Sequence, residues 1–341
     1  MAERFINPIT TAFTILDSYK ESVVQNLQAN QIAFDNISKI VKKLEIDRGV
    51  IISLNREYEH GKAGFRQFCS DNGLVMRLPD LMPKVKQLYL HQEKAIQAIL
   101  KNKPTVISTG TGSGKTETFL IPVIDHCLKN RVPGLKAVVI YPMNALANDQ
   151  LGRIAEYTKN TDLSFGVFIG STPESKTDDT VEQLSANHVV YKADMRANPP
   201  DILVTNYVML ERMLTRDKDY EMFEKSKDIL KYIVIDEVHT YRGNKAGHLR
   251  YLLKRFKSIF NSKPVQIAAS ATLATDKYEG YIKASSLKSF IHPLLDVDEF
   301  EFVEPVFKRE AQDSSGVELI KSVAAKGWNI DIGNEDALKN I

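Results

Sequence analysis

Residues 110–116 read GTGSGKT and combine glycines with a lysine and a threonine, the residue types that hold phosphate groups. Because an apolar run at 104–108 precedes them, a strand is expected to lead into the loop. Glycine tolerates positive φ, so backbone N–H groups can converge on a phosphate, and the next helix adds its positive N-terminal dipole. The lysine would reach the β- and γ-phosphate oxygens, and the threonine hydroxyl would hold Mg²⁺. The residues assigned to the nucleotide here are Thr109, Gly110, Thr111, Gly112, Ser113, Gly114, Lys115 and Thr116.

A second apolar run, YIVIDEVH at residues 232–239, ends in two adjacent carboxylates. The apolar residues bury the strand, so Asp236 and Glu237 emerge at its carboxyl end, where an open α/β sheet places its ligands. Asp236 suits the coordination shell of Mg²⁺ and forms the predicted metal site with Thr116. Glu237 suits orienting and deprotonating an attacking water. The two runs together predict a site that hydrolyses ATP with Mg²⁺.

A third run, VQIAASAT at residues 265–272, predicts a strand that ends in small hydroxyl residues. We assign Ser270, Ala271 and Thr272 to coupling between the nucleotide and a bound nucleic-acid strand. His239 joins Lys115, Asp236 and Glu237 in the catalytic set. A histidine at a strand end is more often a hydrogen-bonded structural residue than a catalyst, and its proposed role is communication between the nucleotide and a bound strand.

The motifs GTGSGKT, DEVH and SAT, in this order, resemble the first RecA-like domain of superfamily 2 helicases of the DEAD/DEAH-box type. The first is its Walker A loop and the second its Walker B strand. Residues 194–256 and YPMNALANDQ at 141–150 are similar in particular to helicases of the YprA, MrfA and Lhr type. The resemblance implies single-stranded or tailed DNA as a partner and work in DNA repair or phage defence. Thr109 departs from the general loop formula, which begins with glycine.

A helix start at 88–100, LYLHQEKAIQAIL, resembles the adenine-side motif of the same family. Gln92 stands where an amide can pair with N6 and N7 of adenine. A single glutamine on a helix is more often an ordinary surface residue, but the position and spacing of Gln92 favour the pairing with adenine.

Several loop residues match motifs that contact the sugar-phosphate backbone in related helicases. An enzyme that moves along nucleic acid must bind every base sequence equally, so it would contact the sugar-phosphate backbone and avoid the bases. The alternative is that the two asparagines of this set cap the helices that follow them, which uses the same free N–H groups. The set consists of Pro142, Asn144, Gln150, Gly170, Thr205 and Asn206.

Apolar runs alternate with helical patterns, which predicts an α/β fold with a mostly parallel sheet, a RecA-like P-loop NTPase domain. The expected strands are 104–108, 136–141, 165–169, 201–205, 231–236 and 265–270. The expected domains are a mainly helical accessory region at 1–85, the ATP-binding domain at 86–290, and a linker at 291–341. A polar stretch at 171–200 is long for a loop and is expected to be partly helical or functional.

The chain has 341 residues, 43% of them hydrophobic, and a net charge of +2, so it lacks the large basic excess of histone-like proteins. Helicase cores hold a strand largely through backbone amides, which tolerates this balance. The basic helix after DEVH is either a solvated face or a strand contact. Only two cysteines and no targeting or membrane segment are present, so a soluble cytoplasmic protein is expected.

The residues that follow Thr272 are too few for a second RecA-like domain of about 150 residues. We expect that lobe, with its arginine finger, from a missing C-terminal part or from a partner chain, so this chain alone should hydrolyse ATP weakly. An alternative function is a non-catalytic ATP-binding interaction module completed or regulated by a partner protein. A small-molecule kinase would share the phosphate loop but gives no reason for SAT.

Overall fold

The computed structural model describes residues 50–52, 57–110, 112–142, 144–176, 183–241, 243–270, 291–297, 299–308 and 330–332. The chain divides into two compact units, one of residues 55–310 and one of residues 1–54 with 311–341. In the second unit, the described residues form a short parallel pair, β1 (Val50–Ile52) with β12 (Ile330–Ile332). The larger unit contains all three motifs. The domain limits at 85/86 and 290/291 stay predictions.

A parallel sheet crosses the larger unit, and its eight described strands lie in the order β11-β4-β10-β9-β5-β8-β6-β7. Each neighbouring pair is parallel. The predicted α/β fold with a mostly parallel sheet is therefore confirmed. Six of these strands coincide with the predicted apolar runs: β4 (Thr105–Ser108), β5 (Ala137–Tyr141), β6 (Phe165–Phe168), β8 (Ile202–Asn206), β9 (Tyr232–Ile235) and β10 (Val265–Ser270).

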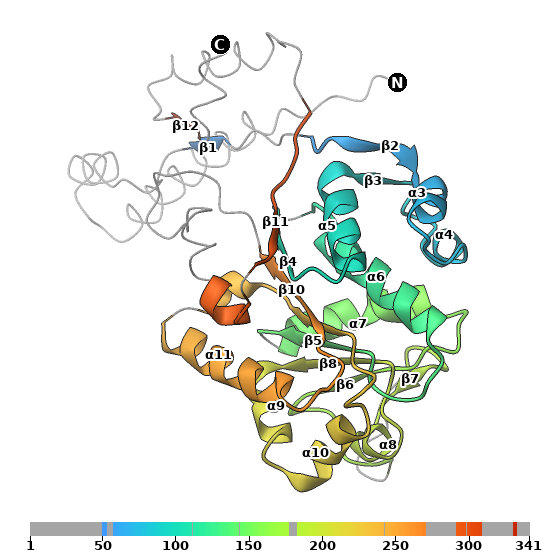
Figure 1. The fold of residues 1–341 in the computed structure, drawn as a ribbon, viewed down its shortest axis with the longest axis vertical. Helices are drawn as coiled ribbons and strands as arrows, with labels where there is room; N and C mark the ends of the chain where they lie inside the picture. Colours follow the sequence, from blue (N-terminus) through green and yellow to red (C-terminus); the bar gives the residue numbers. More distant parts are fainter. Residues whose placement is uncertain are drawn as a thin grey trace, which may run out of the picture. The chain divides into compact units, whose positions relative to one another are not determined.

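Helices cover both faces of this sheet (Figure 1). One layer contains α3 (Phe65–Asp71), α4 (Leu78–Leu81), α5 (Leu90–Leu100), α6 (Lys115–Lys129) and α7 (Asn144–Thr158). The other layer contains α8 (Lys192–Ala197), α9 (Tyr207–Met213), α10 (Asp217–Glu224), α11 (Asn244–Lys257) and a short helix at 291–295. A single 3-10 turn, η1 (Val238–Thr240), follows β9.

The two layers explain why the strands read as unbroken apolar runs. In β5, Val139 belongs to the core under α5 and α6, whereas Val138 and Ile140 belong to the core under α9 and α11. Successive side chains of a strand point to opposite faces, so a strand covered on both sides needs apolar residues throughout. Each fully buried side chain of this size contributes about 1.5–3 kcal/mol.

Several elements were not predicted from the sequence. An edge strand, β11 (Glu301–Val303), pairs with β4 although it lies in residues assigned to a linker. The polar stretch at 171–200 contains β7 (His188–Val189) and α8, which fits its expected partly helical character. An antiparallel pair, β2 (His60–Gly64) with β3 (Gln87–Tyr89), precedes α5. No helix in the described part of the chain has the length and apolar character needed to cross a membrane.

The order of the strands decides which loops meet. The ends of β4, β10 and β9 are neighbours, and the ends of β5, β8 and β6 continue the same edge. Because all these strands are parallel, their carboxyl ends share one side of the sheet, where open α/β sheets bind ligands. One half of this edge, at β4, β10 and β9, carries the predicted phosphate loop and acid pair. The other half, at β5, β8 and β6, carries the residues predicted to contact a nucleic-acid strand, and we call it the strand-contact half.

Candidate active site

The phosphate loop between β4 and α6 uses glycine where no other residue fits. Gly112 and Gly114 have φ values of +76° and +73°, in the left-handed region. A Cβ atom on Gly114 would also lie 2.3 Å from Nε2 of Gln92. Gly114 is the N-cap of α6, and Lys115 is the first helical residue. The backbone therefore turns sharply into a helix whose first N–H groups are free to bind an anion. Thr111 lies outside the described residues.

Side chains of the loop hold it in shape from within. The hydroxyls of Thr109 and Ser113 are 2.7 Å apart, and both residues are fully buried. The ammonium group of Lys115 donates to the carbonyl of Thr109 at 3.1 Å. Thr116 is only 8% exposed. The cation is thus folded over the loop, where the phosphates of a nucleotide would lie.

The acid pair follows β9 with a strained backbone. Glu237 adopts φ +47° and ψ +44°, a left-handed conformation that costs a residue with a side chain about 1–3 kcal/mol. Its backbone N–H donates to Oδ1 of Asp236 at 2.8 Å. Conformations of this kind persist where the surroundings over-determine them, and they cluster at functional sites. Here the strain turns two consecutive carboxylates to the same edge of the sheet.

The environment of Asp236 brings the two motifs together. Burial raises the pKa of this carboxyl to about 6, and the charge of Glu237 adds to that shift. The backbone N–H of Glu237 and the ammonium of Lys115 oppose it. Lys115 therefore lies near enough to act on Asp236, although the two residues are far apart in sequence. A carboxylate whose negative form is disfavoured by burial is suited to a cation such as Mg²⁺.

The end of β10 connects the phosphate loop to the acid pair. The carbonyl of Ser270 accepts from the backbone N–H of Thr109 at 3.2 Å. The Ser270 hydroxyl lies 3.3 Å from Nδ1 of His239, and the same nitrogen lies 3.2 Å from Oε2 of Glu237. Nδ1 of His239 thus lies near a hydroxyl and a carboxylate oxygen, although Oε2 of Glu237 has no hydrogen-bond partner among the described residues. The role of His239 in communication stays a prediction. Ala271 and Thr272 lie outside the described residues.

The predicted strand-contact residues lie along the other half of the edge. Pro142 follows β5, Gly170 follows β6, and Asn206 ends β8. Oδ1 of Asn206 accepts from the N–H of Met209 at 2.7 Å, so this side chain caps α9. The buried Thr205 hydroxyl donates to the carbonyl of Phe168 at 2.7 Å. Asn206 therefore caps α9, and its contact with a nucleic-acid strand stays a prediction.

Asn144 and Gln150 belong to α7, which follows β5. Asn144 is the first residue of this helix, and its side chain lies outside the described part of the chain. Oε1 of Gln150 is buried and has no hydrogen-bond partner among the described residues. An unpartnered buried amide oxygen is costly, by about 1–3 kcal/mol, and is worth attention at a predicted binding edge.

Comparison with known proteins agrees with this geometry. Residues 89–279 match the family model described as DEAD/DEAH box helicase. The chain belongs to this helicase family. The prediction of a superfamily 2 helicase of the YprA, MrfA and Lhr type is confirmed.

Individual relatives are considerably longer than this helicase chain. The uncharacterized ATP-dependent helicase YprA of Bacillus subtilis (strain 168) is 32% identical over 203 residues, which cover 58% of this chain and 24% of that protein. The Druantia protein DruE of Escherichia coli (strain UMEA 4076-1) is 27% identical, with 49% of this chain and 15% of that protein covered. The crystal structure of DUF1998 helicase MrfA bound to DNA has a TM-score of 0.55 and 25% identity, with 79% of this chain and 32% of that one covered.

Gln92 of α5 hydrogen-bonds to the phosphate loop. Its Nε2 donates to the carbonyl of Gly114 at 3.0 Å, and its Oε1 accepts from the N–H of Tyr89 at 2.9 Å. Gln92 is buried, so it is not an ordinary surface residue. One N–H of the amide and one lone pair of its oxygen are not used by these two bonds. The pairing of Gln92 with adenine stays a prediction.

An aromatic cluster beside the helicase loop was missed in the sequence. Tyr89 stacks on His91 with centroids 5.4 Å apart, and Tyr58 contacts both rings. Phe307 stacks on the outer side of Tyr58 at 5.2 Å. Nε2 of His91 donates to the carbonyl of Ser113 at 3.0 Å, and burial lowers the pKa of His91. A repeated Tyr-x-His spacing, at 58–60 and 89–91, was the available signal.

Proposed function

We propose that this chain is the ATP-binding lobe, and half of the nucleic-acid groove, of an ATP-dependent DNA helicase or translocase. One observation carries the proposal: the phosphate loop and the acid pair lie at one sheet edge and are joined through Ser270. An ordinary glycine turn would not need a buried carboxylate close to its lysine. Membership of the DEAD/DEAH box helicase family and the ATP-dependent helicase name of YprA support the same reading.

The residues at the nucleotide half of the sheet edge fit a nucleoside triphosphate with Mg²⁺. The N–H groups of Gly112 and Gly114 would hold phosphate oxygens, and Lys115 would neutralise those of the β- and γ-phosphates. Thr116 and Asp236 would hold Mg²⁺, which when bound offsets negative charge on the transferring phosphoryl group. Two protein ligands would leave the other positions around Mg²⁺ for phosphate oxygens and water.

Glu237 is the proposed general base of the hydrolysis. Its carboxylate would orient the attacking water in line with the γ-phosphate and take a proton from it. His239, 3.2 Å from Oε2 of Glu237, would hold that carboxylate in place. The left-handed backbone at Glu237 would help to set the direction from which the carboxylate meets the water. His239 and Ser270 would then transmit changes in the position of this carboxylate to β10.

DNA is the proposed partner at the second half of the edge. The MrfA structure similar to this chain was solved bound to DNA. Pro142, Gly170 and Asn206 lie at neighbouring strand ends on the same side as the phosphate loop. A single strand held there would be gripped by its backbone through free N–H groups and a few polar side chains. Single-stranded or tailed DNA is therefore the expected substrate.

A second RecA-like lobe is proposed to complete the site. The chain spans about a third or less of the relatives compared here, and the proposal is that the whole protein's activity also uses residues of a second lobe. An arginine supplied by another lobe is worth about 10³–10⁵ in rate in related phosphoryl-transfer systems. We therefore expect nucleotide binding but weak hydrolysis from this chain alone.

The alternative is a non-catalytic ATP-binding module in which nucleotide orders the polar stretch at 171–200 for a partner protein. Contacts within this stretch favour the catalytic proposal. Arg196 pairs with Glu174 and, at 2.6 Å, with the buried Asp219 of α10. The described parts of the stretch are thus anchored to their own domain through Glu174 and Arg196. An intact Glu237 would also serve no purpose in a module that only binds.

Nucleotide affinity of the Lys115→Ala variant tests the proposal directly. Calorimetric titration with a non-hydrolysable ATP analogue and Mg²⁺ should give a dissociation constant at least about 10-fold higher than for the wild type, because a charge-assisted contact is lost. Lys103→Ala is the matched control, since Lys103 is exposed at the opposite end of β4. Equal affinity of all three proteins, or no binding by the wild type, would refute the proposed site.

A further inference from the structure

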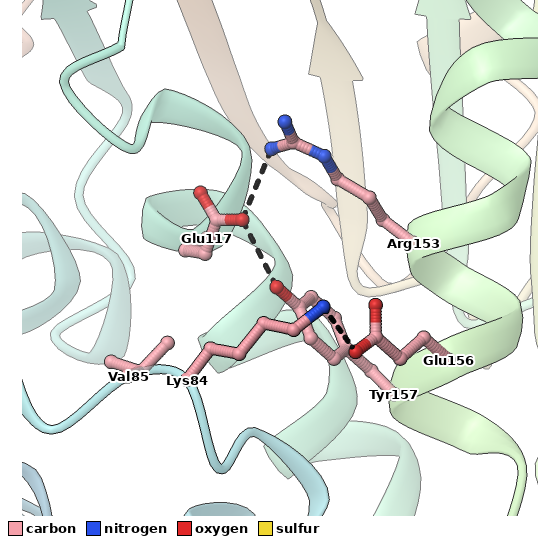
Figure 2. A pocket seen from close by; sticks show the side chains of 6 residues that line it. All are labelled: Lys84, Val85, Glu117, Arg153, Glu156 and Tyr157. Atoms are coloured by element: carbon pink, nitrogen blue, oxygen red, sulfur yellow. Dashed lines mark hydrogen bonds and ion pairs between the residues drawn. The ribbon is translucent and has the colours of Figure 1, made fainter.

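A pocket of about 300 Å³ lies between the start of α6 and the C-terminal half of α7 (Figure 2). It lies beside the phosphate loop and is not used by the proposed hydrolysis. Acidic and basic side chains line it, and they come from α6, from α7 and from the loop before β3. The lining residues are Lys84, Val85, Glu117, Arg153, Glu156 and Tyr157.

Glu117 joins the two helices across this pocket. It directly follows Thr116, yet its carboxylate turns toward α7 (Figure 2). Oε1 of Glu117 accepts from Nη1 of Arg153 at 3.0 Å and from the hydroxyl of Tyr157 at 3.0 Å. An acidic residue in the first turn of a helix also suits the helix dipole. The dipole alone does not explain two donors from a second helix on the same oxygen.

Burial makes this link specific. The side chain of Glu117 is 15% exposed and that of Arg153 is 47% exposed, whereas Tyr157 is buried in the core. Burial raises the pKa of Tyr157 far above its usual value, and the adjacent Glu117 charge raises it further. The hydroxyl therefore stays a donor at every physiological pH. A neutral donor and a cation thus fix one carboxylate at the foot of the phosphate loop.

The receiving helix leads to the strand-contact half of the edge. Arg153 and Tyr157 are four residues apart on α7 and lie on one face of it. Gln150 is three residues before Arg153, so its side chain is a neighbour on the same face. α7 is a continuous helix from Asn144 to Thr158, and a shift at one turn is carried to the others. Contacts of Glu117 with Arg153 and Tyr157 thereby connect the first turn of α6 to the helix that carries Gln150.

We propose that Glu117 is a positioning residue that transmits nucleotide occupancy of the phosphate loop to α7 through Arg153 and Tyr157. The inference rests on the proposed function, because it requires both a nucleotide and a strand. Phosphates bound by Lys115 and Thr116 would move the first turn of α6. Glu117 lies in that turn, so its carboxylate would move Arg153 and Tyr157, and with them the residues of α7 that face the strand.

The same pocket offers a matched control. Nζ of Lys84 lies 2.8 Å from Oε1 of Glu156, with the two side chains 76% and 44% exposed. This pair lines the pocket and involves α7 (Figure 2), but it does not involve α6. Lys84→Met removes an ion pair of α7 without touching the proposed link.

The experiment measures the coupling between two ligands. Fluorescence anisotropy gives the dissociation constant of a single-stranded oligonucleotide with and without a non-hydrolysable ATP analogue and Mg²⁺. The ratio of the two constants should be about 5-fold or more in the wild type, a usual size for coupling between sites. Glu117→Gln and Tyr157→Phe should bring the ratio toward 1, with each ligand's own constant changed less than about 3-fold. Lys84→Met should keep the wild-type ratio.

Each result decides between the claims. A wild-type ratio in Tyr157→Phe, which removes only the hydroxyl, would overturn the coupling role while the proposed function stands. A ratio of 1 in the wild type, with both ligands bound, would do the same. Loss of nucleotide affinity at an unchanged ratio would make Glu117 part of the nucleotide site instead. If the wild type binds neither ligand, the proposed function fails and this inference fails with it.

Discussion

The two halves of the sheet edge hold their polar side chains differently. At the nucleotide half, functional side chains contact one another: His239 lies between Glu237 and Ser270, and the hydroxyls of Thr109 and Ser113 meet in the loop. At the strand-contact half, Asn206 and Thr205 bond to backbone groups. The first arrangement fixes side chains for chemistry, and the second leaves a surface shaped largely by the backbone.

This difference leads to different expectations for substitutions. Residues in one hydrogen-bonded network act as a unit, and removing one of them disturbs the others. Residues whose side chains bond to backbone groups have more separable effects, of about 1 kcal/mol for each hydrogen bond. Substitutions at the nucleotide half should therefore give large, non-additive losses, and those at the strand-contact half should give small losses that add.

Glu237→Gln should give the largest effect. The amide keeps the size of the side chain but cannot take a proton from water, and loss of a general base costs about 10²–10⁴ in rate. Single-turnover hydrolysis of ATP, measured in the protein that carries both lobes, should fall by this factor. The dissociation constant for a non-hydrolysable analogue should change less than about 3-fold, since Glu237 is not expected to hold phosphate.

Glu211→Gln is a suitable control for this loss, because Glu211 is exposed on α9. It removes the same charge at a distance from the acid pair. Hydrolysis at the wild-type rate in Glu237→Gln would show that another group activates the water. The nucleotide half would then be a binding site without the base assigned to it.

Gly114→Ala should lower the free energy of unfolding by more than about 1–2 kcal/mol, the cost of the left-handed conformation for a residue with Cβ. The clash with Gln92 adds to this cost, since the Cβ would lie 2.3 Å from Nε2. Adding Gln92→Ala should remove the clash but not the conformational cost. Urea denaturation of the single and double variants separates the two.

Gly152→Ala gives the contrasting case on α7. Nothing lies within 4 Å of the position of its Cβ, and the residue is inside a helix. Stability should rise by about 0.5–1 kcal/mol, as alanine restricts the unfolded chain and favours helix. Equal effects of the two substitutions would mean that the phosphate loop is not fixed in the conformation described.

The strands and the side-chain contacts of this fold differ in how far the sequence predicts them. Strands β4, β5 and β9 were predicted because burial on both faces demands continuous apolar runs, a local pattern. Strand β11 was missed because three residues at an edge, one of them buried, leave no such pattern. The contact of Glu117 with Tyr157 was missed because it joins two helices across 40 residues. Motif order predicted which strand ends lie along the shared edge of the sheet, but not what their side chains contact.

Asn206 offers the smallest and most discriminating effect. Asn206→Ala removes the cap of α9 and should cost about 0.5–2 kcal/mol of stability. Asn206→Asp keeps a capping oxygen of similar strength, so stability should stay within about 0.5 kcal/mol of the wild type. If Asn206 also lies against the phosphates of a strand, the added charge should weaken binding of single-stranded DNA about 5-fold, as expected for like charges about 4 Å apart in water.

The pair of variants separates two roles that share one side chain. Asn102→Asp is the control for charge, because Asn102 is exposed before β4, at the opposite end of the strands, and adds the same negative charge there. Equal DNA affinity in Asn206→Asp and Asn102→Asp would leave capping as the only role of Asn206. The nucleic-acid strand would then have to be held at this half of the edge by backbone N–H groups and the remaining predicted residues, without Asn206.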